Sequence, residues 1–223
     1  MKFNNQLFYV VIPLLAVAFP FVWYWAVGTS NMLKGEFGII ENMTVFFLLI
    51  SIGICLFSLS HVRSINVPFL YVWLIILMAG AIYFALEEVS YGQHIFRWNT
   101  PEMWKNINSR DETNLHNTSA IIDLFPRILL QISILIGGII FPIYRYFRRI
   151  KLDNRNWLYW LLPTSACLPV SLSVILLRPA YQVLDANFIS INGMKEMLIA
   201  LFILIYCISI RRRLRYWGAN TNG

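Results

Sequence analysis

The amino-acid sequence predicts an all-α integral membrane protein, a single polytopic bundle of about six transmembrane helices. Of its 223 residues, 58% are apolar and only 13% are charged. A soluble domain of this length could not cover its surface with so few polar groups. Apolar stretches of about 20 residues, the length that a helix needs to cross a bilayer, recur along the whole chain. They are continuous rather than alternating, which favours helices over a β-barrel.

Six spans follow from these stretches, within one domain that covers residues 1–223. Prolines lie within or beside the fourth and fifth spans and predict kinks there: Pro126, Pro142, Pro163 and Pro169. We interpret Cys55, Cys167 and Cys207, all inside spans, as packing residues rather than a disulfide framework. The predicted spans are Leu7–Gly28, Gly38–Ser60, Val67–Leu86, Ile121–Phe147, Trp157–Leu177 and Phe188–Ile210.

The net charge of +7 has a one-sided distribution. Arginine and lysine residues cluster in the connection 148–156, between the fourth and fifth spans, and in the tail 211–223. With six spans, both segments and both termini lie on the same side, which the positive-inside rule identifies as cytoplasmic. Basic clusters beside helix ends are typical of topology signals and anionic-lipid contacts. We therefore expect membrane lipids as partners and no nucleic acid.

The longest connection, residues 87–120 between the third and fourth spans, lies on the opposite, outward side. It is polar but dense in aromatic residues, whereas a flexible linker would be rich in glycine and serine. We therefore expect a structured cap on the membrane surface. The string Thr100-Pro101-Glu102 predicts a short helix, with Thr100 as the N-cap and Pro101 at the first helical position.

Ionisable residues of the spans concentrate at the predicted outward ends. Charged groups inside spans cost roughly 2.5–3.5 kcal/mol each on insertion scales and usually face the bundle interior. The pattern therefore predicts a polar chamber that opens outward. Its members are Glu41 with Thr44, Glu87, Glu88, Asp123, Arg127 with Gln131, Arg178, Lys195 and Glu196.

Two explanations apply to different parts of this polar layer. Arg178, Lys195 and Glu196 can reach the lipid headgroups and need no further role. Glu41 and the adjacent Glu87 and Glu88 crowd negative charge near lipid. Such carboxylates need a cation, a shared proton or an arginine. They are therefore candidates for a working site.

The carboxylates and histidines of the outward side are compatible with either a metal site or metal-free acid–base catalysis. Glu87, Glu88, His94 and His116 could ligate zinc, manganese or a similar divalent ion, or supply an acid and a base without metal. Their spacing matches no standard metal signature, and His116 could instead cap the fourth span. Ser90 lies between the acids and His94, but no nucleophile-elbow motif surrounds it.

Three strings resemble the signature of an uncharacterised family of bacterial multi-pass membrane proteins. They are E-E-V-S-Y-G-Q (Glu87 to Gln93), E-T-N-L-H-N (Glu112 to Asn117) and G-E-F-G-I-I-E-N-M-T (Gly35 to Thr44). The resemblance covers the first half of the chain and implies no reaction. His94 stands where that family's pattern has arginine. The polar set it implies is Glu36, Glu41, Glu87, Glu88, Gln93, Asn114 and His116.

The chain is also faintly similar to the ceramidase-like membrane hydrolases, whose acids and histidines hold zinc between helices. Those proteins have a paired histidine motif in a late span. This chain has no histidine after His116.

The leading hypothesis is an enzyme of the bacterial inner membrane that acts on a lipid or lipid-linked substrate at the outer face, by hydrolysis. Its catalytic candidates are Glu41, Glu87, Glu88 and His116. Its substrate-binding candidates are Arg127, Gln93, Asn114, Trp98 and Trp104. The alternative is a lipid or small-solute transporter, or a subunit of an envelope complex. A transporter would need a polar path through the spans, of which Gln131, Thr164, Ser165, Ser171 and Ser173 are the candidates. A structural protein whose outer acids form ion pairs is a third possibility.

Overall fold

The chain is an integral, multi-pass membrane protein built as a helix bundle. The computed structural model describes residues 3–27, 38–62, 67–96, 98–107, 113, 115, 118, 120–153, 156–184 and 190–221. All regular structure in these ranges is helical, which confirms the predicted fold class. Six stretches are long and apolar enough to cross a membrane: Phe8–Val27, Ile39–Val62, Pro68–Glu88, Leu124–Arg148, Trp157–Gln182 and Ile191–Trp217.

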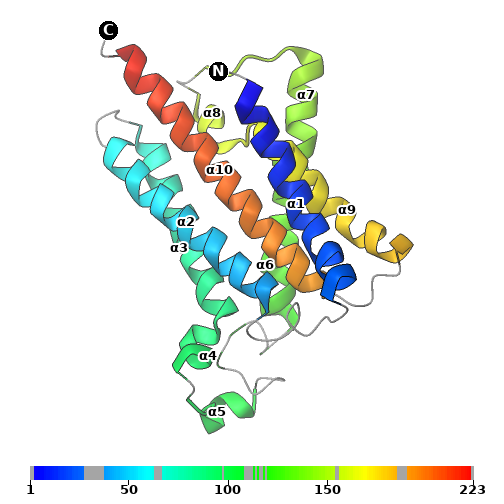
Figure 1. The fold of residues 1–223 in the computed structure, drawn as a ribbon. Helices are drawn as coiled ribbons and strands as arrows, with labels where there is room; N and C mark the ends of the chain where they lie inside the picture. The colour runs from blue at the N-terminus through cyan, green and yellow to red at the C-terminus, as the bar shows by residue number, and fades with distance from the viewer. Residues whose placement is uncertain are drawn as a thin grey trace.

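Helix α10 (Ile191–Thr221) is the axis of the bundle. In Figure 1, α2 (Ile39–Val62) and α3 (Pro68–Glu88) lie on one side of it, and α1 (Phe3–Val27) and α9 (Leu168–Leu184) lie on the other. Its apolar side chains face in all directions and are buried nearly throughout, from Met194 to Leu214. A helix that is apolar all round needs protein or lipid on every side, and α10 obtains protein.

The contact between α2 and α10 is the most extensive in the bundle. One stripe of buried α2 residues recurs at alternating intervals of four and three positions, as in a coiled-coil seam: Thr44, Leu48, Ser51, Cys55, Ser58 and Val62. Small side chains allow two helices to approach closely in a membrane, and the Sγ atoms of Cys55 and Cys207 lie 3.6 Å apart. The three hydroxyls bond to carbonyls of α2 itself, at Ile40, Phe47 and Ile54, so none is left without an acceptor.

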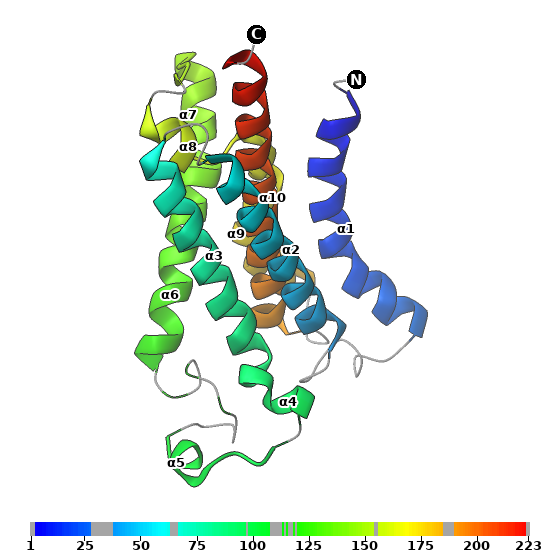
Figure 2. The same ribbon diagram turned by 90° about the vertical axis from the view of Figure 1, so that its left-hand side faces the viewer.

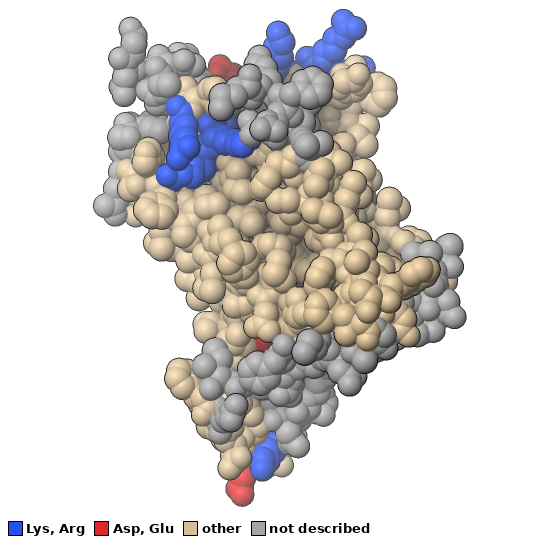
Figure 3. Space-filling model, viewed as in Figure 1, with Lys and Arg blue, Asp and Glu red and all other residues tan. Residues whose placement is uncertain are grey.

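The two ends of the bundle differ in charge. Helix α1 begins and α10 ends at the same end, where α7 (Phe141–Arg148) also lies (Figure 1). We call this the basic end, because lysine and arginine gather there in Figure 3, beyond a broad band of uncharged surface. The opposite, cap end carries η1 (Ser90–Gly92), α4 (Gln93–Phe96) and α5 (Glu102–Lys105). The positive-inside rule predicts that the basic end is cytoplasmic.

The fifth span is broken near the basic end. Helix α8 (Trp157–Leu161) stops before Pro163, and the chain resumes through η3 (Ser165–Cys167) into α9. Pro163 has no N–H to donate to the carbonyl of Tyr159, four residues earlier. Four carbonyls, of residues 159 to 162, therefore leave the helix without a backbone donor. In a bilayer such groups must find partners inside the protein.

Two side chains of α10 supply those partners. The hydroxyl of Tyr206 donates to the carbonyls of Trp160 and Leu161. The Nη1 atom of Arg213 donates to the carbonyls of Tyr159 and Leu162, the latter at 3.3 Å. Arg213 belongs to the segment 211–223 that was expected to be a basic tail, and its side chain is only 8% exposed. The break in the fifth span therefore fastens it to α10.

The fourth span is irregular as well, as its prolines predicted. It consists of α6 (Ala120–Ser133), a π-helical turn η2 (Ile134–Ile140) and α7. The π-helical turn stops just before Pro142, which cannot donate a backbone hydrogen bond. A Cβ atom on Gly138 would lie 2.1 Å from the Oγ atom of Ser171. Only glycine permits this approach of η2 to α9.

We expect Arg213→Leu to lower the free energy of unfolding in mixed micelles by roughly 3 kcal/mol, since a buried acceptor left without a donor costs about 1–3 kcal/mol. The matched control is Arg215→Leu at an exposed position of the same helix end, where we expect a loss below about 0.5 kcal/mol. Pro163→Ala restores a backbone donor for Tyr159 and should recover part of the loss in the Arg213→Leu background. Equal losses in the two leucine variants would contradict this account of the helix break.

Candidate functional site

Charged side chains from four spans meet at the cap end. Glu88 closes α3, and the groups that interact with it electrostatically are Glu196, Glu41, Arg127 and Glu87. Arg127 and Glu196 form an ion pair, with Nη2 and Oε1 at 2.8 Å, and their side chains are 30% and 17% exposed.

The topology explains this meeting. Consecutive spans run in opposite directions, so the N-terminal turns of α2, α6 and α10 come to the end at which α3 stops. Glu41 lies in the first turn of α2, and the N-terminal end of a helix favours a nearby negative charge. Arg127 is the cation that pairs with Glu196 and also interacts electrostatically with Glu88. The structure thus brings together four predicted site residues, Glu41, Glu87, Glu88 and Arg127.

A cavity of about 1100 Å³ extends from this cluster into the membrane-spanning part of the bundle. It lies between α3, α6 with η2, and α10, and it reaches the break in the fifth span at Leu161, Leu162 and Pro163. The gap exists because, among the described elements, only η2 is in extensive contact with α6. Figure 2 shows α6 on the far side of the bundle from α1, beside α3.

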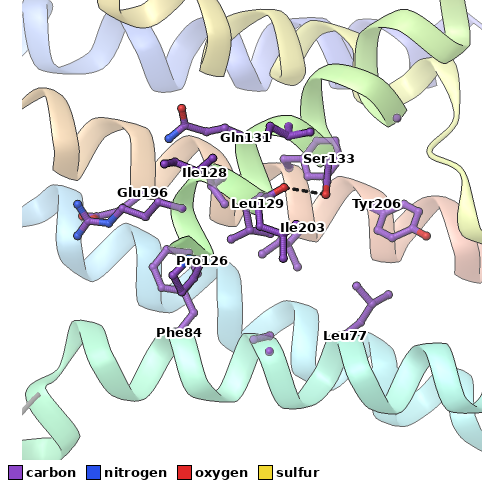
Figure 4. Close-up of a pocket in the computed structure, with 18 of the residues that line it drawn as sticks. Leu77, Phe84, Pro126, Ile128, Leu129, Gln131, Ser133, Glu196, Ile203 and Tyr206 are labelled. Atoms are coloured by element: carbon purple, nitrogen blue, oxygen red, sulfur yellow. Dashed lines mark hydrogen bonds and ion pairs between the residues drawn. The ribbon is translucent and has the colours of Figure 1, made fainter. Parts of the chain in front are cut away.

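The cavity has a charged end and a long apolar body. Its charged lining consists of Glu87, Glu88, Arg127, Arg178, Lys195 and Glu196. Figure 4 shows Glu196 toward one end and Tyr206 toward the other, with Ile128, Leu129 and Ile203 between them. Tyr206 accepts a hydrogen bond from Nε1 of Trp73 at 2.8 Å, and both side chains line the deep end. A charged mouth above an apolar channel is the shape that an amphiphile requires.

Two further cations lie at the mouth. Lys195 is close enough to Arg178 and Arg127 for their positive charges to repel it. Arg178 comes from α9 and Lys195 from the first turns of α10, so the pair spans two helices. In the part of the chain that the structure describes, Arg127 pairs with Glu196, whereas Arg178 and Lys195 form no ion pair with a described carboxylate.

Glu87 is buried, 5% exposed, and holds the cap. Its carboxylate accepts hydrogen bonds from the Tyr91 hydroxyl at 2.7 Å and from the backbone N–H of Leu115 at 3.0 Å. Burial, this hydrogen bond and the charge of Glu87 raise the pKa of Tyr91 above its ordinary value. The phenol therefore remains a donor at neutral pH. Glu87 has a structural task that the prediction of a catalytic or metal-binding role did not include.

Gln93 holds the same segment of the cap. Its Oε1 atom accepts from the backbone N–H of Thr113 at 2.6 Å, and its Nε2 atom donates to Oγ1 of Thr100 at 2.7 Å. Two of the three strings, Glu87 to Gln93 and Glu112 to Asn117, are therefore in direct contact, because residues 87 and 93 bind residues 115 and 113. Gln93 therefore has a structural role in the cap, and its role in substrate binding stays a prediction.

The short helix predicted at Thr100-Pro101-Glu102 forms, but it begins one residue later than expected. Helix α5 starts at Glu102, Pro101 occupies the N-cap position, and no side chain caps it. Thr100 instead receives the hydrogen bond from Gln93. The side chain that was expected to cap α5 thus joins the segment before α5 to α4.

A strained turn joins α3 to α4. Ser90, Tyr91 and Gly92 all have positive φ, at 46°, 54° and 94°, a conformation that costs a residue other than glycine about 1–3 kcal/mol. A Cβ atom on Gly92 would lie 3.2 Å from the Phe96 ring. That ring stacks on Trp98, with centroids 5.9 Å apart and planes at 8°. The turn aims Tyr91 back at Glu87 and gives Ser90, which no nucleophile-elbow motif surrounds, a buried position, 1% exposed.

The remaining predicted residues divide into two groups. Trp98 is 40% exposed and Trp104 half-buried on α5, and neither belongs to the described lining of the cavity. Glu36, Asn114 and His116, and the side chains of His94 and Asp123, lie outside the described residues. Among described residues no group of three or more His, Cys, Asp and Glu side chains could hold a metal ion. The metal site remains a prediction.

Arg178, Lys195 and Glu196 were expected in the polar chamber but not among the catalytic or binding residues, because each can reach a headgroup from a helix end. The spacing of the lining residues along α10 could have indicated their place in the site. Asn192, Lys195, Glu196, Ile199, Phe202, Ile203 and Tyr206 recur every three or four positions, so they form one face. That face lines the cavity from the mouth to the deep end. A charged pair that continues into an apolar stripe indicates a lining rather than a lipid anchor.

Comparison of the chain with protein-family models, curated proteins and solved structures finds no match. The resemblance to the bacterial membrane family therefore stays an expectation from the three strings.

The contacts of Gln93 predict a local effect on the cap. We expect Gln93→Leu to speed hydrogen exchange at the amide of Thr113 by about tenfold, since a lost hydrogen bond of about 1–1.5 kcal/mol raises the open population by that factor. The same substitution at the exposed Gln182 on α9 is the control and should leave this amide unchanged. Unchanged exchange in Gln93→Leu would contradict the assigned contact.

Proposed function

We propose that this protein acts on a lipid or lipid-linked substrate at the outer face of a bacterial inner membrane, by hydrolysis. The observation that carries the proposal is the cavity of about 1100 Å³, whose charged mouth continues into an apolar body. Pockets for small ligands usually measure about 300–1,000 Å³, so this one has room for a long-chain molecule. The positive-inside rule supports an outward mouth, because the basic residues gather at the opposite end.

The lining supports a lipid rather than a small polar solute. Of the five residues that could have formed a polar path through the spans, Gln131 lines the cavity, whereas Ser171 and Ser173 bond to carbonyls four residues earlier. Ser133, which does line the cavity, donates to Leu129. The cavity body is lined mainly by aliphatic and aromatic side chains, which suit an acyl or prenyl chain. A hydrophilic solute would meet no continuous row of partners there.

Glu88 is the candidate for acid–base chemistry in this proposal. Glu87 is occupied with the cap and Glu196 with Arg127, whereas Glu88 lines the mouth between them, half-buried. In hydrolysis Glu88 would take a proton from the attacking water. It would return that proton to the oxygen that leaves when the ester bond breaks. Arg127 would stabilise the negative charge that develops on the substrate. His116 remains a further candidate, outside the described residues.

Occupation of the cavity can be tested with a blocking side chain. Gly80 lines the cavity, and a Cβ atom there would have no atom within 4 Å. We expect Gly80→Phe to fold normally and to reduce the lipid that co-purifies with the protein by at least about tenfold, because the ring fills space that the chain would occupy. Gly53→Phe, also in open space but on α2 and away from the cavity, is the control. Equal lipid content in both variants would refute binding in the cavity.

The reaction requires a separate test. Purified protein in nanodiscs of total bacterial lipid should release a polar product, detected by mass spectrometry. We expect Glu88→Gln to slow the release by at least about a hundredfold, the usual contribution of an acid–base group, without loss of co-purified lipid. Glu102→Gln, on an exposed carboxylate of α5, should retain the rate. Lipid binding without any product, in wild type and variant alike, would replace the enzyme with a lipid carrier, the rival that the deep cavity also accommodates.

A further inference from the structure

The charges at the mouth of the cavity balance in number, but they are not all paired with one another within the described site. Six charged side chains line it, three acidic and three basic. Arg127 pairs with Glu196 at 2.8 Å, and Glu87 accepts hydrogen bonds from the cap. Arg178 and Lys195 form no ion pair with any carboxylate among the described residues.

These two cations are arranged as a pair. They come from α9 and α10 and are close enough to repel each other electrostatically. Like charges held together cost free energy, which an anion between them would recover. The amide of Asn192 lies one turn before Lys195 on α10 and lines the same cavity. A guanidinium, an ammonium and an amide together offer donors to several oxygens of one group, as phosphate recognition requires.

Reaching the lipid headgroups, the simpler explanation of Arg178 and Lys195, does not account for their place. Lys195 is half-buried, and both residues line the cavity with Glu88 and Arg127. From Lys195 the same face of α10 continues to Tyr206, about 16 Å deeper at 1.5 Å per residue. An anion held at Lys195 would therefore lie directly above the apolar body of the cavity.

We infer that the molecule bound in this cavity is an anionic amphiphile, with a phosphate-class headgroup between Arg178 and Lys195 and an apolar chain between α3, α6 and α10 that points toward Tyr206. The inference rests on the proposed function, because it names the class of lipid that the same cavity takes. It also explains the arrangement of the mouth, in which the bound phosphate would lie beside Glu88 and the Arg127–Glu196 pair.

The test compares ligands that share one chain and differ in the headgroup. Hexadecyl phosphate, hexadecanol and inorganic phosphate are titrated against the full-length protein in a neutral detergent, and binding is followed by native mass spectrometry. We expect hexadecyl phosphate to bind at least about tenfold more tightly than hexadecanol, as charge-assisted hydrogen bonds to two cations imply. Inorganic phosphate alone should bind far more weakly, because it has no chain to bury.

Variants connect this preference to the two residues. The double variant Arg178→Gln with Lys195→Gln should lose the preference for the phosphate and keep the affinity for hexadecanol. The retained affinity for hexadecanol shows that this double variant folds, and the charge-conserving pair Arg178→Lys with Lys195→Arg should retain most of the preference. Arg148→Gln with Lys151→Gln, at the basic end, is the matched control and should change nothing at this site.

The outcomes separate the two proposals. If hexadecyl phosphate and hexadecanol bind with equal affinity, and Gly80→Phe abolishes the binding of both, the inference of an anionic headgroup would be overturned and the lipid site would stand. Inorganic phosphate that binds as tightly as hexadecyl phosphate would identify a soluble anion and overturn the amphiphile. If neither hexadecyl phosphate nor hexadecanol binds, and Gly80→Phe does not change the amount of co-purified lipid, the proposed function itself would be overturned.

Discussion

The structure depends on one constraint of the bilayer, that backbone polar groups inside it need partners from the protein. Pro163 breaks the fifth span and exposes four carbonyls, and Tyr206 and Arg213 of α10 bind them. This fastens the basic end of α10 to the broken span. The opposite end of the same helix carries Lys195 and Glu196, so one helix is locked at one end and bears the candidate site at the other. The cavity extends along α10 between these two ends.

The position of α6 creates the space for that cavity. At Gly138 the fourth span approaches α9 so closely that a methyl group would not fit, yet α6 itself packs extensively only on η2. The span is therefore held at its middle and diverges toward the cap end, where Arg127 reaches across to Glu196. The close contact of Gly138 with α9 and the ion pair of Arg127 with Glu196 at the cap end bound a chamber, and neither contact fills it. These two contacts connect the fourth span to α9 and to α10.

The features that the sequence predicted are those that depend on local pattern. Continuous apolar stretches define the six spans, prolines mark the two irregular ones, and acidic residues at helix ends indicate the polar layer. The partners of these residues follow from the folded chain alone. Leu115 binds Glu87 with its backbone, and Arg213 enters the core although its neighbours in sequence form a basic cluster. Thr100 fits a helix cap by sequence but lies nearer to Gln93. In each case a contact distant in sequence outweighs the local preference.

The way in which Glu87 and Gln93 hold the cap has an evolutionary consequence. Both acceptors bind main-chain N–H groups, at Leu115 and Thr113, and every amino acid except proline carries such a group. These hydrogen bonds therefore do not depend on the side chain of the donor residue, but they do require the side chain of the acceptor residue. Relatives that share this cap can drift at positions 113 and 115 while positions 87 and 93 stay constant. Variation at 113 and 115 would then say nothing against a shared cap, whereas a proline at either position would.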